Sequence, residues 1–191
     1  MTEYIYLPVP SSEMEQMARD MQKTRLREKA NLPFLVHNAH LSGYRKGMAH
    51  ILGDGCLKKV QGGDTVYLLI HGTGAADSET ISAKRILPNG VEERKRYTPK
   101  EIAHTLEKEG LTKSLVDLKL LVCGAGLVGT KSSMGQRIFE ALKKRGYGRI
   151  RVTAYLGNVK VGSSSGYMVN RQTTPGNWEL ISADQGQVVY G

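Results

Sequence analysis

The chain has 191 residues, of which 40% are hydrophobic and 24% are charged. This length and composition fit one folded domain with a substantial core and exclude a disordered chain. Two cysteines are too few for a disulfide scaffold, and the sequence contains no apolar run long enough to span a membrane. The N-terminus lacks a secretory signal, so we expect synthesis in the cytoplasm, with export, if any, by a signal-independent system.

The first part of the chain predicts one strand and two helices. Residues 3–9 form a short apolar stretch closed by prolines, which favours an edge strand. Ser12 with Glu15 fits a capping box, which predicts a polar helix from there to about residue 30. A buried segment is expected over residues 33–36, and a further helix is expected over residues 42–52.

Three apolar runs then predict the strands of a central sheet, at residues 65–70, 118–122 and 150–156. Capping boxes that begin at Thr98 and Ser133 predict one helix in each interval between these strands. The order strand, helix, strand, helix, strand is typical of a mainly parallel sheet that carries helices on both faces.

Two further segments lie outside this alternation. Residues 72–96 are polar and rich in glycine, which predicts a long loop that could serve as a flap over a site or as a self-processing strand. Within that segment, residues 87–90 predict a turn in a small hairpin. The tail, residues 166–191, predicts a β-hairpin of residues 167–172 against residues 178–181.

These elements together predict a single α/β domain over residues 1–191. Its expected parts are an N-terminal elaboration over residues 1–60, a core over residues 65–156 and the C-terminal hairpin. The formal net charge is +9, spread over short runs of lysine and arginine. Such runs are typical of solvated helix faces and loops, and they would also fit an anion site.

Two of the predicted strands end on a reactive side chain. His71 follows the apolar run of residues 65–70, and Cys123 follows the run of residues 118–122. If the two strands are parallel neighbours, both side chains emerge at the carboxyl edge of one sheet, where open α/β sheets bind their ligands. A thiol beside an imidazole is the minimum set for thiolate catalysis. Taken singly, the cysteine also fits a small buried hydrophobe and the histidine a polar strand end.

The two residues are 52 positions apart, since 123 − 71 = 52. A strand ending in His-Gly followed by a strand ending in Cys resembles the caspase-like cysteine peptidases, a clan with caspases, gingipains, clostripain and the autoprocessing domains of bacterial toxins. The resemblance covers roughly residues 65–156. It implies a three-layer sandwich with a caspase- or gingipain-like, mainly parallel central sheet, to which the C-terminal hairpin is added.

The resemblance also implies roles for individual residues. Cys123 would be the nucleophile and His71 the base or the leaving-group acid. The backbone N–H groups of Gly72 and Cys123 would hold the oxyanion. Gly74, Gly124 and Gly126 would lie in loops near the site. Val122 stands where the family usually has Gly or Ala.

The implied function is that of a cysteine-type endopeptidase, a hydrolase, in a bacterial virulence effector or toxin domain. Its partner would be a protein substrate in a host or rival cell. Some relatives are activated by an inositol polyphosphate, so the resemblance allows such an activator here, and no metal or other cofactor is expected. The positive charge is compatible with a polyanion. Nucleic acid is not expected as a partner.

Two alternatives stay open for the same fold. One is a non-catalytic effector that only binds a partner. The other is a nucleotide-binding protein, because residues 124–129 match the G-x-G-x-x-G fingerprint and follow a strand. Residues 130–133 intervene before the helix cap, however, and the next strand does not end in an acidic residue.

Other groups of residues give weaker indications of a metal site or a substrate groove. His37, Asn38 and His40 lie close together in the sequence, but no carboxylate or cysteine at the usual spacing completes a metal site. Trp178 could line a substrate groove or pack against the sheet. The sequence specifies neither the substrate, nor the cleavage preference, nor the oligomeric state.

Overall fold

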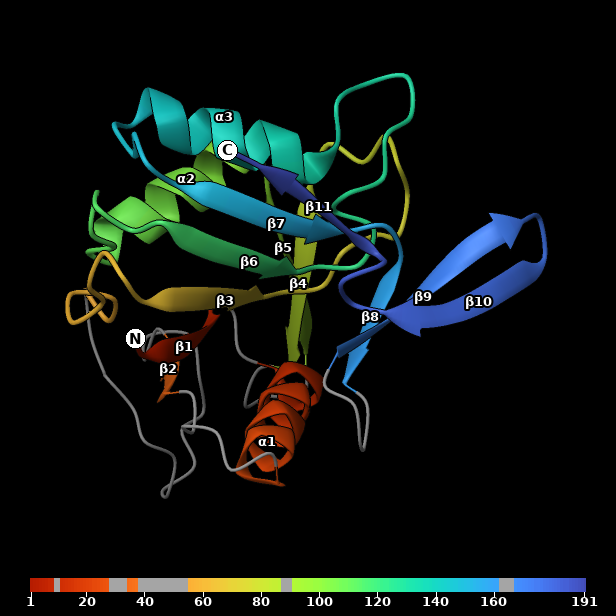
Figure 1. Ribbon diagram of the computed structural model, residues 1–191, viewed down its shortest axis with the longest axis horizontal. Helices are drawn as coiled ribbons and strands as arrows, with labels where there is room; N and C mark the ends of the chain where they lie inside the picture. The colour runs from red at the N-terminus through yellow and green to blue at the C-terminus, as the bar shows by residue number, and fades with distance from the viewer. Residues whose placement is uncertain (9–10, 28–33, 38–54, 87–90, 162–166) are drawn as a thin grey trace.

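The computed structural model describes residues 1–8, 11–27, 34–37, 55–86, 91–161 and 167–191. Its central feature is a six-stranded sheet, shown in Figure 1. In spatial order, its strands are β2 (Phe34–His37), β1 (Glu3–Leu7), β3 (Thr65–Leu69), β6 (Asp117–Leu121), β7 (Arg151–Tyr155) and β11 (Gln187–Tyr190). The first five strands are parallel, and β11 pairs antiparallel with β7. The expectation of a mixed α/β fold with a mainly parallel sheet is confirmed.

Helices cover both faces of this sheet (Figure 1). Successive residues of a strand point to opposite faces, so β3 contributes to two cores. Val66 and Leu68 belong to the core on the side of α2 (Pro99–Lys108) and α3 (Met134–Lys144). Tyr67 and Leu69 belong to the core on the side of α1 (Ser12–Arg27). All five residues of β3 are buried, as expected for a parallel strand covered on both sides.

The helix caps agree with the sequence in part. At α2, the Thr98 hydroxyl accepts from the N–H of Glu101, whose carboxylate accepts from the N–H of Thr98, so the capping box is complete. At α3, the Ser133 hydroxyl accepts from the N–H of Gln136 at 3.0 Å. The predicted second half of that box is wrong, because the Gln136 amide donates to Glu140 one turn along the helix.

The predicted cap of α1 is wrong by one residue. The N–H of Met14 donates to the Ser11 hydroxyl at 3.3 Å, so Ser11 caps the helix and Ser12 is its first residue. The sequence offers two adjacent serines, and either can start a helix locally. The position of the buried face decides between them, because Met14, Ala18 and Met21 must face the sheet.

The prediction of β1 as an edge strand is also wrong. β1 lies between β2 and β3 and pairs parallel with both. Pro8 follows the last paired residue of β1, Leu7, so it removes no ladder hydrogen bond. The segment predicted as buried over residues 33–36 overlaps β2, whose side chains lie outside the description, so its burial stays a prediction. The helix predicted over residues 42–52 lies outside the described residues.

Residues 72–96 do not form the predicted long loop. Residues 81–97 contain an antiparallel hairpin of β4 (Ile81–Ile86) and β5 (Glu92–Tyr97), which confirms the small hairpin. The predicted turn at residues 87–90 lies outside the described residues. Ile81 and Tyr97, which pair at the base of this hairpin, are buried in the core beneath α2. The connecting loop is therefore shortened to residues 72–80.

The C-terminal region forms a second, smaller sheet beside the carboxyl edge of the central one (Figure 1). β9 (Tyr167–Thr174) pairs antiparallel both with β10 (Asn177–Ser182) and with β8 (Asn158–Val161). The chain then returns to the edge of the central sheet as β11. Two loops and this small sheet consequently surround the carboxyl ends of β3 and β6.

Candidate active site

The register of β3 and β6 places the two predicted reactive residues opposite each other. The strands are parallel neighbours, and their pairing runs from Thr65↔Asp117 to Leu69↔Leu121, a constant offset of 52 since 117 − 65 = 52. The same offset relates His71 to Cys123, which lie two residues beyond the last pair. Both residues therefore leave the sheet at the same edge, as the sequence predicts.

Contacts between the two loops confirm this arrangement. A Cβ atom on Gly72 would lie only 2.0 Å from the carbonyl oxygen of Cys123 and 2.7 Å from its backbone nitrogen. Gly124 has a φ of +71°, and a Cβ atom there would lie 2.9 Å from the Cα of Gly74. Glycine is required at positions 72 and 124 because any side chain would separate the two loops.

The His71 imidazole has a charged neighbour that the sequence did not reveal. Its Nε2 lies 3.3 Å from Oε2 of Glu13, in the first turn of α1. The His71 side chain is 28% exposed and that of Glu13 is 75% exposed, so the pair lies at the surface of the site. Glu13 and His71 are 58 positions apart, since 71 − 13 = 58, and only the packing of α1 on the sheet brings them together.

The Cys123 thiol is half-buried. Burial raises its pKa, and the nearby Glu13 carboxylate raises it further, while the backbone N–H groups of Val159 and of Cys123 itself lower it. The net effect is a pKa above the ordinary value of a thiol, so at neutral pH the sulfur carries its proton. A neutral thiol is unreactive until a base removes that proton.

The other cysteine provides a contrast within the same chain. Cys56 is buried, and burial together with a hydrogen bond to the Glu109 carboxylate raises the pKa of its thiol strongly. The same carboxylate accepts from the backbone N–H groups of Gly55 and Cys56 at 3.1 and 3.2 Å. These contacts tie the turn that contains Cys56 to the end of α2, which is a structural role.

Gly124 and Gly126, in the segment that matches the nucleotide-binding fingerprint, make backbone hydrogen bonds to other parts of the protein. The N–H of Gly124 donates to the carbonyl of Gly157, and that of Gly126 donates to the carbonyl of Tyr155, both at 2.9 Å. Gly126 is buried against β7, where a Cβ atom would lie 3.0 Å from the Tyr155 backbone. A phosphate cradle needs backbone N–H groups that point at the ligand. These two are already bonded to protein carbonyls, so the geometry gives the nucleotide alternative no support.

Hydrogen bonds and an ion pair connect the loop after Cys123 to the loop after His71. The Asp77 carboxylate accepts from the N–H of Lys131 at 3.0 Å, and it also bonds the backbone of Thr130. These backbone hydrogen bonds lower the pKa of Asp77. The Lys131 ammonium pairs with Glu79, which lowers the pKa of that carboxyl. These contacts hold the two loops together next to the candidate site.

A groove of about 310 Å³ opens beside the Cys123 loop. Its walls come from both loops, from the β7–β8 turn and from the β9–β10 hairpin: Gly74, Leu127, Leu156, Gly157, Asn158, Gln172, Thr173, Thr174, Pro175 and Trp178. None of these residues is charged. Trp178 is 52% exposed, so it is not part of the core. Of the two possibilities for Trp178, its exposure and its place in the groove wall favour the groove, and a substrate in that groove stays a prediction.

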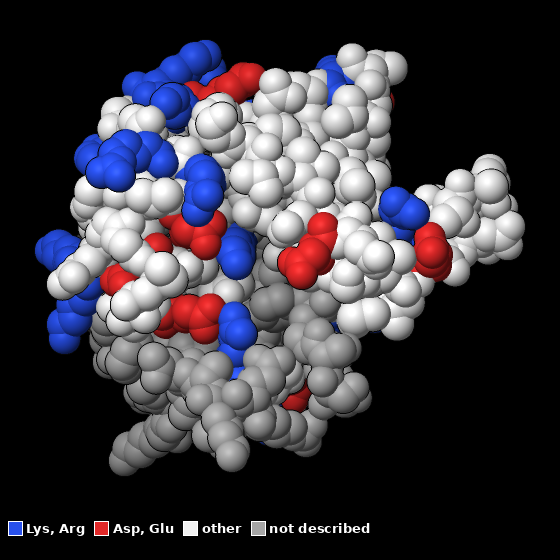
Figure 2. Space-filling model, in the orientation of Figure 1, with Lys and Arg blue, Asp and Glu red and all other residues white. Residues whose placement is uncertain are grey.

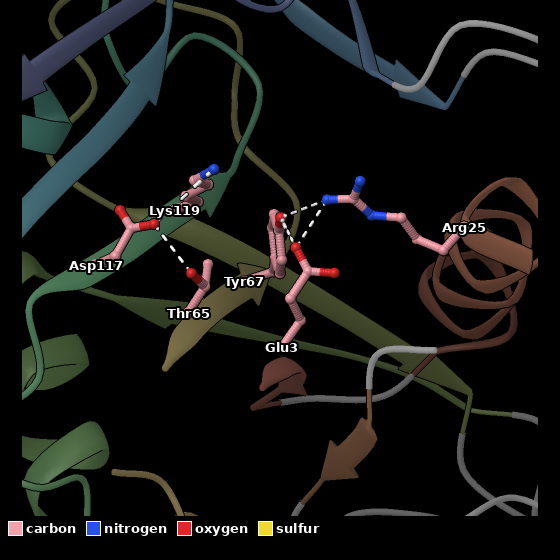
Figure 3. A network of polar contacts seen from close by, with 6 residues as sticks. All are labelled: Glu3, Arg25, Thr65, Tyr67, Asp117 and Lys119. Carbon is pink, nitrogen blue, oxygen red and sulfur yellow. Dashed lines mark hydrogen bonds and ion pairs between the residues drawn. The ribbon is translucent and has the colours of Figure 1, made fainter. Parts of the chain in front are cut away.

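A polar network anchors the far end of α1 to the same sheet, as Figure 3 shows. Arg25 donates to the Glu3 carboxylate at 2.7 Å and to the Tyr67 hydroxyl at 3.1 Å, and that hydroxyl donates to Glu3 at 2.7 Å. The network thus joins α1 to β1 and β3. Together with the apolar face of α1, it fixes the direction of the helix and so brings Glu13 to His71.

A second groove, of about 580 Å³, lies between the start of α2 and the outer side of α3. Its walls include four basic residues, Lys100, Arg137, Lys144 and Arg145, and Figure 2 shows Lys and Arg side chains gathered at the end of the view where α3 lies. Two carboxylates, Glu79 and Glu140, line the same groove. Its charge is therefore mixed, and a polyanion as partner stays a prediction.

Compared with known proteins, the chain matches no protein-family model and no curated sequence. Within the described residues, no three His, Cys, Asp or Glu side chains are grouped so that they could hold a metal ion. His37 is described only in its backbone, and Asn38, His40 and His50 lie outside the described residues. The helices in the described part of the chain are too short or too polar to cross a membrane.

Proposed function

We propose that this chain is a caspase-like cysteine peptidase, with Cys123 as its nucleophile and His71 as its general base. The observation that carries the proposal is the shared register of β3 and β6, which brings an imidazole and a thiol to one sheet edge. The contact between Gly72 and the Cys123 backbone supports it, because it shows how closely the two strand ends approach. The half-buried state of both side chains leaves them accessible to a substrate.

The proposed reaction begins with a neutral thiol. As the Cys123 sulfur attacks a peptide carbonyl carbon, its proton passes to His71, and the carbonyl oxygen becomes an oxyanion. The backbone N–H groups of Gly72 and Cys123 would stabilise that oxyanion. The C–N bond then breaks as His71 returns the proton to the leaving amine. Water, activated by the same imidazole, hydrolyses the thioester and restores the thiol.

The surroundings of the sulfur suit a thiolate that forms only during the reaction. The N–H groups of Val159 and Cys123 face it and favour the charged form, whereas burial and Glu13 oppose that form. Proton transfer to His71 also creates an imidazolium next to the Glu13 carboxylate, an arrangement that favours the transfer. The wider setting — a bacterial effector or toxin acting on a protein of a host or rival cell, with or without an inositol polyphosphate — rests on the family resemblance alone.

An alkylation experiment tests the proposal. The protein is treated with iodoacetamide at pH 7.5, and labelling of Cys123 and Cys56 is followed by mass spectrometry. We expect Cys123 to react faster than Cys56, and His71→Ala to slow labelling of Cys123 by about tenfold or more. His104→Ala is the matched control, because His104 is an exposed histidine on α2. Equal loss in both variants, or no loss in either, would refute the catalytic pair.

The non-catalytic alternative has one observation in its favour. The raised pKa of the Cys123 thiol is the opposite of what an already activated cysteine shows. If Cys123 labels no faster than Cys56 and is indifferent to His71, the chain is better described as a binding module that uses the same sheet edge as its surface.

A further inference from the structure

The uncharged groove beside the Cys123 loop has walls made of elements that also touch the candidate nucleophile. Gly157, in one wall, accepts the hydrogen bond from the N–H of Gly124. Asn158, in the same wall, directly precedes Val159, whose N–H faces the Cys123 sulfur. Gly74, in the opposite wall, lies against Gly124. The groove walls therefore contact or adjoin residues that neighbour Cys123 in sequence or in space.

The walls of this groove offer apolar and neutral polar surface and no charge. Leu127, Leu156 and Trp178 provide the apolar part. Asn158 provides an amide whose Oδ1 would lie 3.5 Å from a Cβ atom on Gly74, so the amide reaches toward the opposite wall. On the hairpin outside the groove, Arg171 and Glu179 pair with each other at 3.1 Å. A charged group that entered the groove would lose water without gaining an ionic partner.

The exposed tryptophan gives the groove a wall fitted to a large side chain. Trp178 stands on β10, in the hairpin that projects beyond the central sheet (Figure 1), and is 52% exposed. Aromatic side chains with this exposure at the mouth of a groove contribute contact area at little entropic cost, which is why they are enriched at binding surfaces. A volume of about 310 Å³ is ample for one large side chain.

We propose that this groove is the specificity site of the peptidase and that it accepts an uncharged side chain of the polypeptide substrate, excluding Asp, Glu, Lys and Arg. The inference rests on the proposed function, because it needs the substrate carbonyl at Cys123. It adds the substrate class, which is a protein segment that presents a large neutral residue next to the bond to be cleaved. The ten residues that line the groove contribute nothing to the net charge of +9.

Four peptidyl chloromethyl ketones that differ only in the residue next to the electrophile test the inference. That residue is Leu, Gln, Asp or Lys, and each probe alkylates the cysteine with loss of chloride. We expect the Leu and Gln probes to label Cys123 about tenfold faster than the Asp and Lys probes. Trp178→Ala should reduce the rate with the Leu probe severalfold. Leu180→Ala, at an exposed apolar position of the same strand outside the groove, should leave it unchanged.

An isosteric substitution gives an independent result. Asn158→Asp would place a carboxylate in the groove wall, so we expect the ratio of Lys-probe to Leu-probe rates to rise about tenfold. Any effect of that carboxylate on the thiol changes both rates alike and cancels in the ratio. Equal rates with all four probes, or an Asn158→Asp ratio equal to that of the wild type, would overturn the inference.

The proposed catalytic pair and the proposed specificity site can be refuted by different results. Iodoacetamide carries no residue for the groove, so its His71-dependent labelling of Cys123 reports only on the catalytic pair. If that labelling is present and the peptidyl probes show no preference, the groove is not the specificity site and the proposed function stands. If the labelling is absent, the proposed function has failed, and a remaining preference among the probes would show a peptide-binding groove without catalysis.

Discussion

The contact between Glu13 and His71 leads to two predictions: loss of the carboxylate should slow peptide hydrolysis and should make the Cys123 thiol reactive at lower pH. Glu13→Gln removes the carboxylate that lies 3.3 Å from Nε2 of His71. In the proposed mechanism His71 becomes positively charged when it takes the thiol proton, so loss of Glu13 should slow peptide hydrolysis. The same carboxylate raises the pKa of Cys123, after burial as the larger cause. Its removal should therefore lower the pH at which the thiol becomes reactive toward iodoacetamide.

The expected size of the first effect follows from exposure. Glu13 is 75% exposed and His71 is 28% exposed, so solvent screens their attraction. Exposed ion pairs contribute about 0.2–1 kcal/mol, and 1.36 kcal/mol corresponds to a factor of ten in rate. We therefore expect kcat to fall by no more than about fivefold in Glu13→Gln. Removal of a general base costs about 10²–10⁴-fold, so His71→Ala should be far more damaging.

Glu15→Gln is the matched control, because it removes the same charge from the same helix turn. The assay measures hydrolysis of a fluorogenic peptide that carries the residue preferred by the groove, together with the pH dependence of iodoacetamide labelling. Slower turnover with a labelling midpoint at lower pH, seen in Glu13→Gln and not in Glu15→Gln, would support the reasoning. A 100-fold loss of kcat would show that Glu13 takes part directly, and a midpoint at higher pH would refute the electrostatic argument.

Two further predictions concern the loops around the site. Asp77→Asn should lower the melting temperature at pH 7, and this difference from the wild type should vanish in acid. The pKa of Asp77 is lower in the folded protein than in the unfolded chain. Its contribution to stability is therefore complete at a pH above the ordinary carboxyl pKa, and it is lost as the pH falls through the pKa of the folded protein. A difference in melting temperature that persists at pH 2 would contradict this. Gly72→Ala should abolish the faster labelling of Cys123, because the new Cβ atom would lie 2.0 Å from the Cys123 carbonyl oxygen. Gly148→Ala, where a Cβ atom meets nothing within 4 Å, should label like the wild type, and equal behaviour of the two variants would argue against the close approach.

The parts of the fold that the sequence predicted are those with a local cause. β3 is an apolar run buried on both faces, and β6 is mainly apolar with Asp117 and Lys119 half-exposed, so both strands are recognisable without knowing their partners. The caps at Thr98 and Ser133 depend on residues three positions away. The common offset of β3 and β6 also brought His71 opposite Cys123, but only after the two strands were assumed to be parallel neighbours.

The errors have non-local causes. Whether β1 is an edge or an internal strand depends on β2, which pairs with it from residues 34–37. The β4–β5 hairpin was predicted only from its turn residues, and its strands were assigned to a long loop, because β5 has the sequence Glu-Glu-Arg-Lys-Arg-Tyr, which shows no apolar alternation. Among the hairpin side chains that the structure describes, those buried in the core are Ile81 and Tyr97, which pair with each other. A strand held by one such pair carries almost no signal in its own sequence.

The same distinction applies to the candidate site. Cys123 and His71, the proposed nucleophile and base, follow mainly apolar strands, so the sequence could indicate them. Glu13 and the groove could not be predicted, because their positions depend on where α1 and the β9–β10 hairpin pack. The N-terminal helix and the C-terminal hairpin contribute to the two sides of the site. The predicted core of residues 65–156 is therefore insufficient to build it.

The opposing influences on Cys123 suggest how such a site would avoid indiscriminate reaction. Burial and Glu13 keep the thiol protonated, while two backbone N–H groups are already placed to stabilise the thiolate. In the proposed mechanism, a peptide that fills the groove would exclude water and hold its carbonyl next to the sulfur, so proton transfer to His71 would be more productive than it is with the groove empty. A small electrophile such as iodoacetamide would be assisted by His71 but would not be positioned by the groove. The preference of Cys123 for a peptidyl probe over iodoacetamide should therefore exceed that of a free thiol such as glutathione, and it should decline toward the glutathione value in Trp178→Ala. An unchanged ratio would mean that the groove and the nucleophile act independently.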